Sequence, residues 1–487
     1  QNNHTTKVID INVPESIKEI KINGDYYPRE QKDSEKVKKL VYPAVKKYLN
    51  GISYDSGEIK DIVDNFSSVR NLVRYALFDP EEEIRAQAIN FFRTVQINND
   101  FASIGCKKGF IPAGEWKLVL EFHAITTEEL TIELEIQLNE LETEPVESAR
   151  KHLSEKEELQ NIETKNMINS DKDWYCGDLH VHSHHSDGNN SVAELVKYFL
   201  KQKIDFFVLS DHNTTAGWKE DLLQNILVLP GCEITSFFGH MVAINQEDYV
   251  DWYNLDKNSN FKDIGKRLHK NNSFISVAHY GSIGNPVCTG CRWEYSNIDW
   301  QIVDFMEILL EPSGTRKPET LRALNKWEDL LNRGLKVVAV SGTDLHNINY
   351  EKTNIPLTYI KAEKLTKKNI LNNLKAGKVY LSCGIDIGFS IYWKQKKYII
   401  GDEIEVDANN KLKLALNIKN LPDKSTIEIV KNGNVIKKYK SDNKLDKNIE
   451  IKVKKDSWIN LRIKNINDGL IGLTNPIYCN FSRKNNL

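Results

Sequence analysis

Two histidines separated by one residue, His180 and His182, come at the end of an apolar segment that begins at Trp174. Side chains two residues apart in a strand point to the same face, so both imidazoles could bind one metal ion. Asp187 follows five residues after His182 in a Ser-Asp-Gly turn, which can fold its carboxylate back toward the same place. Nine of the chain's twelve histidines lie between His180 and His346, which favours a polynuclear site over a chance cluster.

Further residues that can bind a metal stand at the ends of other apolar, β-branched runs. These residues are Asp211, His212, Glu233, His240, His279, Asp344 and His346. In parallel α/β barrels the carboxyl ends of the strands converge on one mouth, so ligands distant in sequence can meet in space. A single histidine at a strand end is more often a satisfied polar residue. Five strand ends with this property together favour a metal centre.

The types of these side chains indicate the chemistry. Imidazoles and carboxylates without thiolates suit Zn, Mn or Fe near hydrolytic water, rather than a structural cysteine site. A carboxylate can also bridge two cations. Paired ions lower the pKa of bound water, orient a phosphoryl or carbonyl oxygen and neutralise charge in the transition state.

The elements that must position these residues alternate between strand and helix. The predicted strands are Asp205–Leu209, Ile226–Leu229, Phe274–Ala278, Ile302–Leu310 and Leu335–Val340, and the predicted helices are Val192–Lys201, Phe261–Lys270, Lys317–Asn332 and Thr366–Ala376. This alternation is typical of a parallel, barrel-like α/β domain, which we place at residues 173–389.

The flanks of this domain have a different character. Strands within Val8–Tyr27, at Trp116–Phe122 and at Leu130–Ile136, with a helix at Ser34–Leu49, predict a β-rich domain at residues 1–140. Residues 141–172 are rich in Glu, Lys, Asn and Ser, which predicts a solvated linker or an exposed helix.

From residue 390 to 487 the sequence predicts an immunoglobulin-like β-sandwich. Its expected strands include Lys411–Ile418, Thr426–Lys431 and Ile449–Val453, and Asn432-Gly433-Asn434 is a hairpin turn. This tail is rich in lysine, but few aromatic residues are interleaved, so a solvated face is favoured over a nucleic-acid surface.

Composition limits the class of protein. A chain of 487 residues exceeds what one core usually serves, so we expect two or three domains. With 40% apolar residues, 28% charged residues and a net charge of -2, neither a nucleic-acid nor an anionic-membrane partner is expected. No apolar run is long enough to span a bilayer. The first ten residues carry no apolar signal core, so a cytoplasmic location is expected, although a processed secreted form would look the same.

The order of the motifs resembles that of the PHP family, the polymerase-and-histidinol-phosphatase metallohydrolases. The shared motifs are His-x-His with a downstream Ser-Asp-Gly, Ser-Asp-His, Gly-x-Glu, a strand-end His and Asp-x-His, and they lie between Trp174 and Gly384. The flanks resemble the carbaryl-hydrolase-related branch, through Ile111-Pro112-Ala113-Gly114-Glu115-Trp116 and a C-terminal end near Leu473–Ile477.

The resemblance implies a distorted seven-stranded β/α barrel with two or three divalent ions. One ion would take His180, His182, Glu233 and Asp344; a second would share Glu233 and add His240 and His279; a third would take Asp187, His212 and His346. Asp187 stands where many members have His, and if His240 only packs, the centre is binuclear. The implied mechanism is attack by a metal-bridging hydroxide on a phosphoester, or on an amide or carbamate carbonyl.

Other residues are candidates for smaller roles. Asp211 and Asp344 could orient a ligand or carry a proton in catalysis. Four residues could contact substrate, although a solvated loop and ordinary surface arginines also explain them: His184, His185, Arg292 and Arg316.

Two features of the remaining sequence favour structural roles. His269 sits late in a predicted helix, where a cation is favourable. Cys288 and Cys291 have the spacing of a redox or zinc pair, but a tetrahedral zinc site needs four ligands. Seven cysteines spread over the chain predict reduced thiols.

The sequence therefore predicts a metal-dependent hydrolase that acts on a small molecule, with a phosphoesterase as the leading expectation. An amide or carbamate hydrolase with the same centre is the alternative. A non-catalytic binding module, whose two β domains dock on partners, is the alternative from another class. The intact set of ligands argues against the binding module.

Overall fold

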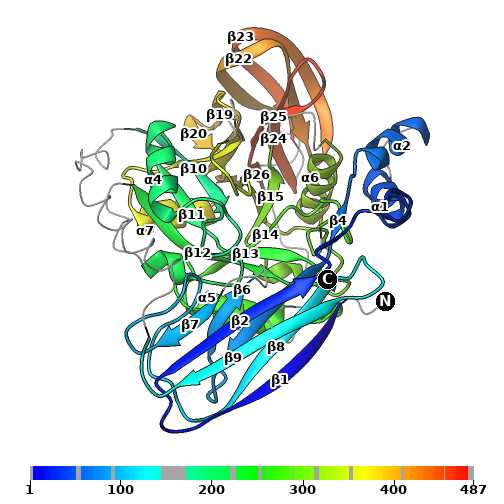
Figure 1. The fold of residues 1–487 in the computed structure, drawn as a ribbon. Helices are drawn as coiled ribbons and strands as arrows, with labels where there is room; N and C mark the ends of the chain where they lie inside the picture. The colour runs from blue at the N-terminus through cyan, green and yellow to red at the C-terminus, as the bar shows by residue number, and fades with distance from the viewer. Residues whose placement is uncertain are drawn as a thin grey trace.

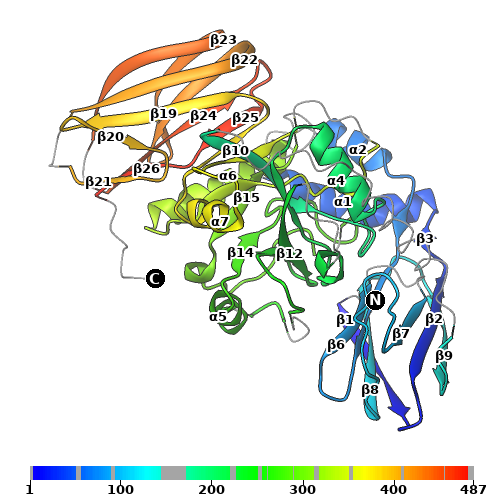
Figure 2. The same cartoon turned by 90° about the vertical axis from the view of Figure 1, so that its left-hand side faces the viewer.

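The computed structural model describes residues 4–50, 56–88, 94–143, 172–219, 226–250, 255–259, 261–288, 290–311, 317–349, 355–406, 411–453 and 456–480. It is a mixed α/β protein, rich in strands, in which three parts follow one another along the chain (Figures 1 and 2). Most of the predicted linker, residues 144–171, lies outside the described residues. Among the helices of the described ranges, none is long and apolar enough to cross a membrane.

The N-terminal part is built from two antiparallel sheets. One has the order β1 (Thr5–Val13), β8 (Gly114–Ala124), β5 (Leu72–Phe78), β6 (Ile84–Ala88), and the other has the order β7 (Val95–Asn98), β2 (Glu19–Tyr27), β9 (Thr131–Asn139). The alternating residues of these strands place Ile20, Trp116 and Leu118 in a shared core. Beside the sheets lie α1 (Ser34–Leu49), α2 (Ser56–Asp64) and the short strands β3 (Glu30–Gln31) and β4 (Val69–Arg70). Helix α1 begins where the Asp33 carboxylate accepts a hydrogen bond from the Lys36 N–H.

The central part carries the strands that position the candidate ligands. They are β10 (Trp174–Val181), β11 (Phe206–Leu209), β12 (Leu227–Thr235), β13 (His240–Ile244), β14 (Phe274–Val277), β15 (Phe305–Leu309) and β16 (Val338–Ser341), and each pairs with the next. A parallel bridge between Val181 and Leu345 brings the chain after β16 back to β10. The helices here are α4 (Val192–Lys201), α5 (Lys262–Lys270), α6 (Lys317–Asn332) and α7 (Lys367–Lys375), with short 3-10 helices at Ala216–Lys219 and Trp300–Ile302.

The α/β class is confirmed, but a seven-stranded β/α barrel is not. Strand β13 is antiparallel to both of its neighbours, β12 and β14. Only Ser236–Gly239 connects β12 to β13, and a connection this short can join antiparallel strands but cannot return a chain for a parallel pair. The N-terminal half of β10 also pairs with β17 (Leu357–Lys361), and β17 pairs with β18 (Val379–Ser382), so the sheet extends beyond the expected barrel.

The C-terminal part consists of strands alone within the residues described. They are β19 (Asp386–Trp393), β20 (Lys396–Ile399), β21 (Glu403–Ile404), β22 (Lys411–Lys431), β23 (Asn434–Lys452), β24 (Ser457–Lys464), β25 (Leu470–Thr474) and β26 (Ile477–Cys479). The prediction of separate strands at Lys411–Ile418 and Thr426–Lys431 is wrong, because both belong to β22, whose pairing with β23 shifts register around Leu421. The hairpin turn is present, with positive φ angles of 52° at Asn432 and 81° at Gly433.

Asn475 joins the central and C-terminal parts. Its Oδ1 accepts a hydrogen bond from the Ala339 N–H at 2.8 Å, and its Nδ2 donates to the Ala339 carbonyl at 2.8 Å and the Val379 carbonyl at 3.1 Å. These bonds tie β16 to the segment before β26, while β18 pairs directly with β25. The C-terminal part therefore restrains β16, the strand that leads to Asp344.

We expect Asn475→Ala to destabilise the protein. The Asn475 side chain is buried, and its loss removes the hydrogen bonds to the Ala339 N–H and carbonyl, which costs about 3 kcal/mol in free energy of unfolding. The Val379 carbonyl keeps the hydrogen bond from the Asn475 backbone N–H. Urea denaturation followed by tryptophan fluorescence measures the change. As a control, Asn467→Ala, at an exposed position, should change it by less than about 0.5 kcal/mol. Equal stabilities of the two variants would contradict this account.

Candidate metal centre

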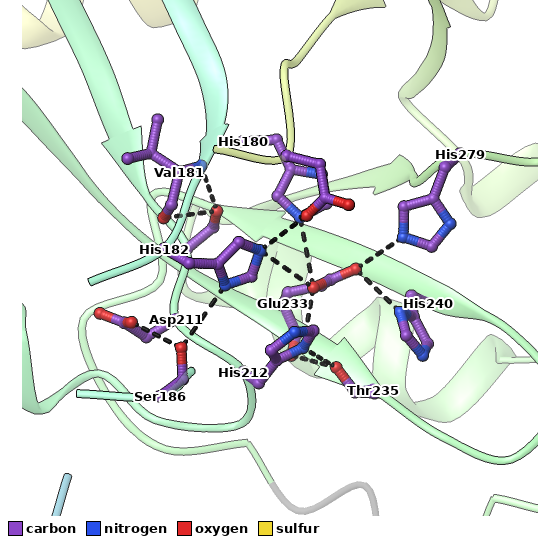
Figure 3. A network of polar contacts seen from close by, with 12 residues as sticks. His180, Val181, His182, Ser186, Asp211, His212, Glu233, Thr235, His240 and His279 are labelled. Atoms are coloured by element: carbon purple, nitrogen blue, oxygen red, sulfur yellow. Dashed lines mark hydrogen bonds and ion pairs between the residues drawn. The ribbon is translucent and has the colours of Figure 1, made fainter. Parts of the chain in front are cut away.

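Five of the candidate ligands meet around one carboxylate, that of Glu233: His180, His182, His212, His240 and His279 (Figure 3). Glu233 lies on β12 and is fully buried. Its Oε1 is 3.0 Å from His279 Nε2 and 3.1 Å from His240 Nδ1. Its Oε2 is 3.2 Å from His180 Nε2, 3.4 Å from His182 Nε2 and 2.8 Å from His212 Nδ1. Each carboxylate oxygen thus faces its own set of imidazoles, as a bridging ligand requires.

The candidate ligands form three overlapping groups, two of which contain this carboxylate. They are His180, His182, Glu233 and Asp344; His182, Asp187, His212 and His346; and His212, Glu233 and His240, with the ligand atoms of each group within 4.8 Å of one another. The first group is the ligand set that the PHP resemblance implies for one ion. The second is the implied third set with His182 added. In the remaining group His212 takes the place expected for His279, although His279 still contacts Glu233.

Several of the imidazoles are held in one orientation by acceptors in the protein. His180 Nδ1 is 2.8 Å from Glu307 Oε1, His279 Nδ1 is 2.9 Å from the Cys291 carbonyl and His346 Nδ1 is 2.8 Å from the Asp344 carbonyl. A carbonyl or carboxylate oxygen can only accept, so Nδ1 carries a proton in each ring and the lone pair of the neutral imidazole lies on Nε2. In these three rings, Nε2 is the atom that faces the other candidate ligands. Burial lowers the pKa of both His279 and His346, but Glu233 outweighs it and raises the pKa of His279 to about 9, and Asp344 outweighs it and raises the pKa of His346 to about 10, so a cation at these two rings would displace the Nε2 proton.

Unpartnered buried atoms test whether this cluster fits a cation. Among the residues described, His180 Nε2, His182 Nε2, Asp187 Oδ1 and Glu233 Oε2 are buried and make no hydrogen bond of good geometry, although ring nitrogens lie close to both carboxylate oxygens. Buried polar atoms are nearly always satisfied, so four unsatisfied atoms in one place need an explanation. Neutral nitrogens and carboxylate oxygens are lone-pair donors for divalent ions, and the donor set therefore fits.

The protonation of the cluster follows from burial and mutual contact. Burial raises the pKa of Glu233, but the imidazoles of His212, His180 and His240 outweigh it and hold the pKa well below its usual value. Burial, with the neighbouring His346 and His212, lowers the pKa of His182 to about 4. His182 is therefore neutral near pH 7 and can donate its lone pair.

Sequence analysis missed two residues that support the ligands. Glu307, on β15, accepts from His180 and also from the His279 N–H at 2.9 Å. Thr235 lies 2.5 Å from His212 Nδ1 through its hydroxyl, which also donates to the Glu233 carbonyl. A single carboxylate inside the apolar segment Phe305–Leu310 was the available signal for Glu307.

The N-terminal part also reaches the centre. Arg74, on β5, donates a hydrogen bond from Nη1 to the Thr235 carbonyl at 2.7 Å. The Gly105 N–H donates to His185 Nδ1 at 3.2 Å. His185 is therefore buried at the contact between the N-terminal and central parts, whereas the sequence predicted an exposed turn.

The contacts of two other candidate residues favour structural roles, and the expected roles of the remaining two are not tested. The Asp211 carboxylate accepts from the Ser183 N–H, the Ser183 hydroxyl and the Ser186 hydroxyl at 2.7–2.8 Å, which favours positioning of the turn over proton transfer. Arg292 is half-buried and Nη1 donates to the Lys47 carbonyl on α1. The backbone N–H of His184 donates to the Asn190 carbonyl, and its role as a substrate contact stays a prediction. Arg316 lies outside the described residues.

Two structural expectations have different outcomes. His269 Nε2 lies 2.8 Å from Asp304 Oδ2, a contact remote from the ligands and consistent with a structural role. The expectation of reduced thiols is wrong for Cys288 and Cys291, which form a disulfide with a Cα–Cα distance of 5.5 Å. The other five cysteines are free.

No protein-family model and no curated protein matches the chain. Among solved structures, a two-domain protein from Bacteroides vulgatus that contains a predicted PHP-like metal-dependent phosphoesterase is similar, with 16% identity, a TM-score of 0.37 and coverage of 64% of this chain and 99% of that one. A lesion-specific endonuclease from Pyrococcus furiosus has 15% identity, a TM-score of 0.30 and coverage of 42% and 56%. An amidohydrolase from Chromobacterium violaceum has 14% identity, a TM-score of 0.25 and coverage of 35% and 88%. Similarities this weak decide neither the reaction nor the carbaryl-hydrolase-related branch.

We expect Glu307→Gln to weaken metal binding by about 10- to 100-fold. The amide keeps the size of the side chain, but it loses the charge that faces His180 and places an NH2 or a weaker acceptor against the His279 N–H. Competition with a chromogenic chelator measures the dissociation constant. Glu405→Gln, at an exposed position, is the control and should leave it unchanged. Unchanged affinity in Glu307→Gln would show that this carboxylate does not orient the ligands.

Proposed function

We propose that the chain is a metal-dependent phosphoesterase whose centre holds two or three divalent ions. One observation carries the proposal: both oxygens of the buried Glu233 face imidazole nitrogens of five histidines, all within 3.4 Å. An ordinary buried ion pair needs one partner. Five imidazoles, two of them (His180 and His279) held in one orientation by another acceptor, suit a carboxylate that bridges cations. Zn, Mn or Fe fits this donor set.

Different residues would bind the different ions. Such ions, when bound, lower the pKa of water, orient a phosphoryl oxygen and neutralise charge that develops on it. His180, His182 and Asp344 would hold one ion with Glu233, and His240 and His279 lie on the other side of that carboxylate. Asp187, His212 and His346 would hold a further ion.

Exposure indicates the side from which substrate approaches. The side chains of Asp344, His346 and Asp187 are 22%, 34% and 23% exposed, whereas those of His180, His182 and Glu233 are fully buried. Three carboxylates, Asp187, Glu233 and Asp344, would repel a phosphoryl group at this opening. Binding of a phosphoester therefore depends on the ions, which reverse the sign of the local charge.

Elemental analysis with an activity panel tests the proposal. Protein purified without chelator should contain two or three divalent ions per chain and hydrolyse a nitrophenyl phosphomonoester or phosphodiester. Glu233→Ala should lose the ions and lower activity by at least about 100-fold, because both sides of the centre share this residue. Glu363→Ala, at an exposed position, is the matched control.

The same panel separates the alternatives. Hydrolysis of an aryl amide or carbamate without hydrolysis of either phosphoester would assign the centre to the other reaction. Full metal occupancy with no turnover of any ester or amide would favour a binding module. Fewer than one ion per chain would overturn the metal centre.

Asp187→Asn should remove one ion and leave the others. Asp187 Oδ1 lies 3.1 Å from His346 Nε2 and 3.5 Å from His212 Nε2, and it belongs to only one of the three groups. The amide oxygen is a weaker, uncharged ligand, so the metal content should fall by about one ion per chain. Elemental analysis beside the wild type and Asp187→His, which supplies an imidazole in its place, checks the result. Loss of every ion in Asp187→Asn would show that the groups do not bind independently.

A further inference from the structure

The Cys288–Cys291 disulfide lies in a loop that supports two candidate ligands. This loop, Gly281–Tyr295, follows His279 directly. The Cys291 carbonyl accepts the hydrogen bond from His279 Nδ1 at 2.9 Å. That bond leaves His279 Nε2 facing Glu233 Oε1 at 3.0 Å. The disulfide therefore closes a backbone ring whose last residue, Cys291, carries the carbonyl that accepts from a candidate ligand.

The same segment packs against His240. A Cβ atom at Gly290 would lie 2.8 Å from His240 Nε2 and 2.1 Å from the Ser236 carbonyl, so the backbone passes close to the imidazole. Gly290 has a φ of +76°, which also favours glycine. Trp293 Nε1 donates to the His240 carbonyl at 2.8 Å. Both rings that face Glu233 Oε1 thus depend on residues 290–293.

The loop is anchored at its ends by elements from elsewhere in the chain. At its start, Arg322 on α6 donates from Nη1 to the Gly281 carbonyl at 3.0 Å. Near its end, the Glu294 N–H donates to the Phe238 carbonyl at 2.7 Å, and the Glu294 carboxylate pairs with Lys47 on α1. Cys288 lies between these anchors, where its backbone N–H makes a longer contact, 3.3 Å, with the Gly284 carbonyl. The disulfide is thus the covalent restraint on the part of the loop that meets the ligands.

We propose that this disulfide positions His279 and His240, and that its reduction weakens the binding of the ion on the Glu233 Oε1 side. The inference rests on the metal centre proposed above. Reduction breaks the bond between the two sulfurs and adds two electrons and two protons, giving the Cys288 and Cys291 thiols. With a phosphine as reductant, phosphorus supplies the two electrons and takes an oxygen from water to become the phosphine oxide. Cys288 is partly exposed, which allows a small reductant to reach it, whereas Cys291 is buried.

The test compares metal retention in the two redox states of the whole chain. Zinc-loaded protein is incubated without oxygen, with or without tris(2-carboxyethyl)phosphine, and then dialysed against a competing chelator. Thiol titration after denaturation should count five thiols in the oxidised protein and two more after reduction. We expect the oxidised protein to retain one ion more than the reduced protein, with an affinity for that ion about 10- to 100-fold higher. A cobalt-substituted sample should show the same change in its visible absorption.

Cys288→Ser with Cys291→Ser supplies the matched control. The double variant should bind metal as the reduced wild type does, and the phosphine should not alter it further. Reoxidation with oxidised glutathione should restore the ion to the wild type and not to the variant. Since the wild type is measured in both states, a poorly folded variant leaves the comparison intact.

The outcomes separate the two proposals. Equal metal retention in the oxidised and reduced wild type would overturn the positioning role while leaving the metal centre standing. Seven thiols in untreated denatured protein would also overturn it. An absence of bound metal in every redox state would instead overturn the proposed function, and this inference with it.

Discussion

The charge on Glu233 is the constraint on which the rest of the structure depends. A carboxylate without exposure to water is costly unless other groups compensate its charge. Five imidazoles do so here, and each needs an orientation that a neighbour must supply. Glu307 supplies it for His180, and the Cys291 carbonyl supplies it for His279. The centre is thus a network in which each carboxylate or carbonyl holds an imidazole and the imidazoles together hold Glu233.

The hairpin of β12 and β13 brings His240 to Glu233, which a parallel arrangement of these two strands would not do. Thr235 pairs with His240, and Glu233 pairs with Val242, so all four side chains lie on one face of the hairpin. His240 thereby comes within reach of Glu233 although it lies at the start of its strand and not at the end. The antiparallel strand that departs from the expected barrel is therefore the one that adds a candidate ligand.

Much of the site could be predicted from sequence, because ligands at the ends of apolar runs combine two independent signals, burial and chemistry. His180, His182, Glu233 and Asp344 carry both, and the structure places them in one group. Glu307 could not be assigned in the same way, since it lies within a strand and its partners are distant in sequence. The long strand β22 contains both predicted strands, Lys411–Ile418 and Thr426–Lys431, because its pairing with β23 continues across the polar segment between them. The Cys288–Cys291 pair depends on a backbone path that spacing alone does not determine.

The flanking parts are structural components of the centre. Arg74, from the N-terminal sheets, bonds the Thr235 carbonyl, and the Thr235 hydroxyl contacts the ring of His212. Helix α1, from the same part, meets the loop that supports His279 through the pair of Lys47 and Glu294. On the opposite side, Asn475 holds the strand that leads to Asp344. Ligands from separate strands keep a common geometry only if their strands cannot shift independently, and these contacts restrain the strands from both ends of the molecule. The two β-rich parts therefore shape the site even though neither contributes one of the grouped ligands.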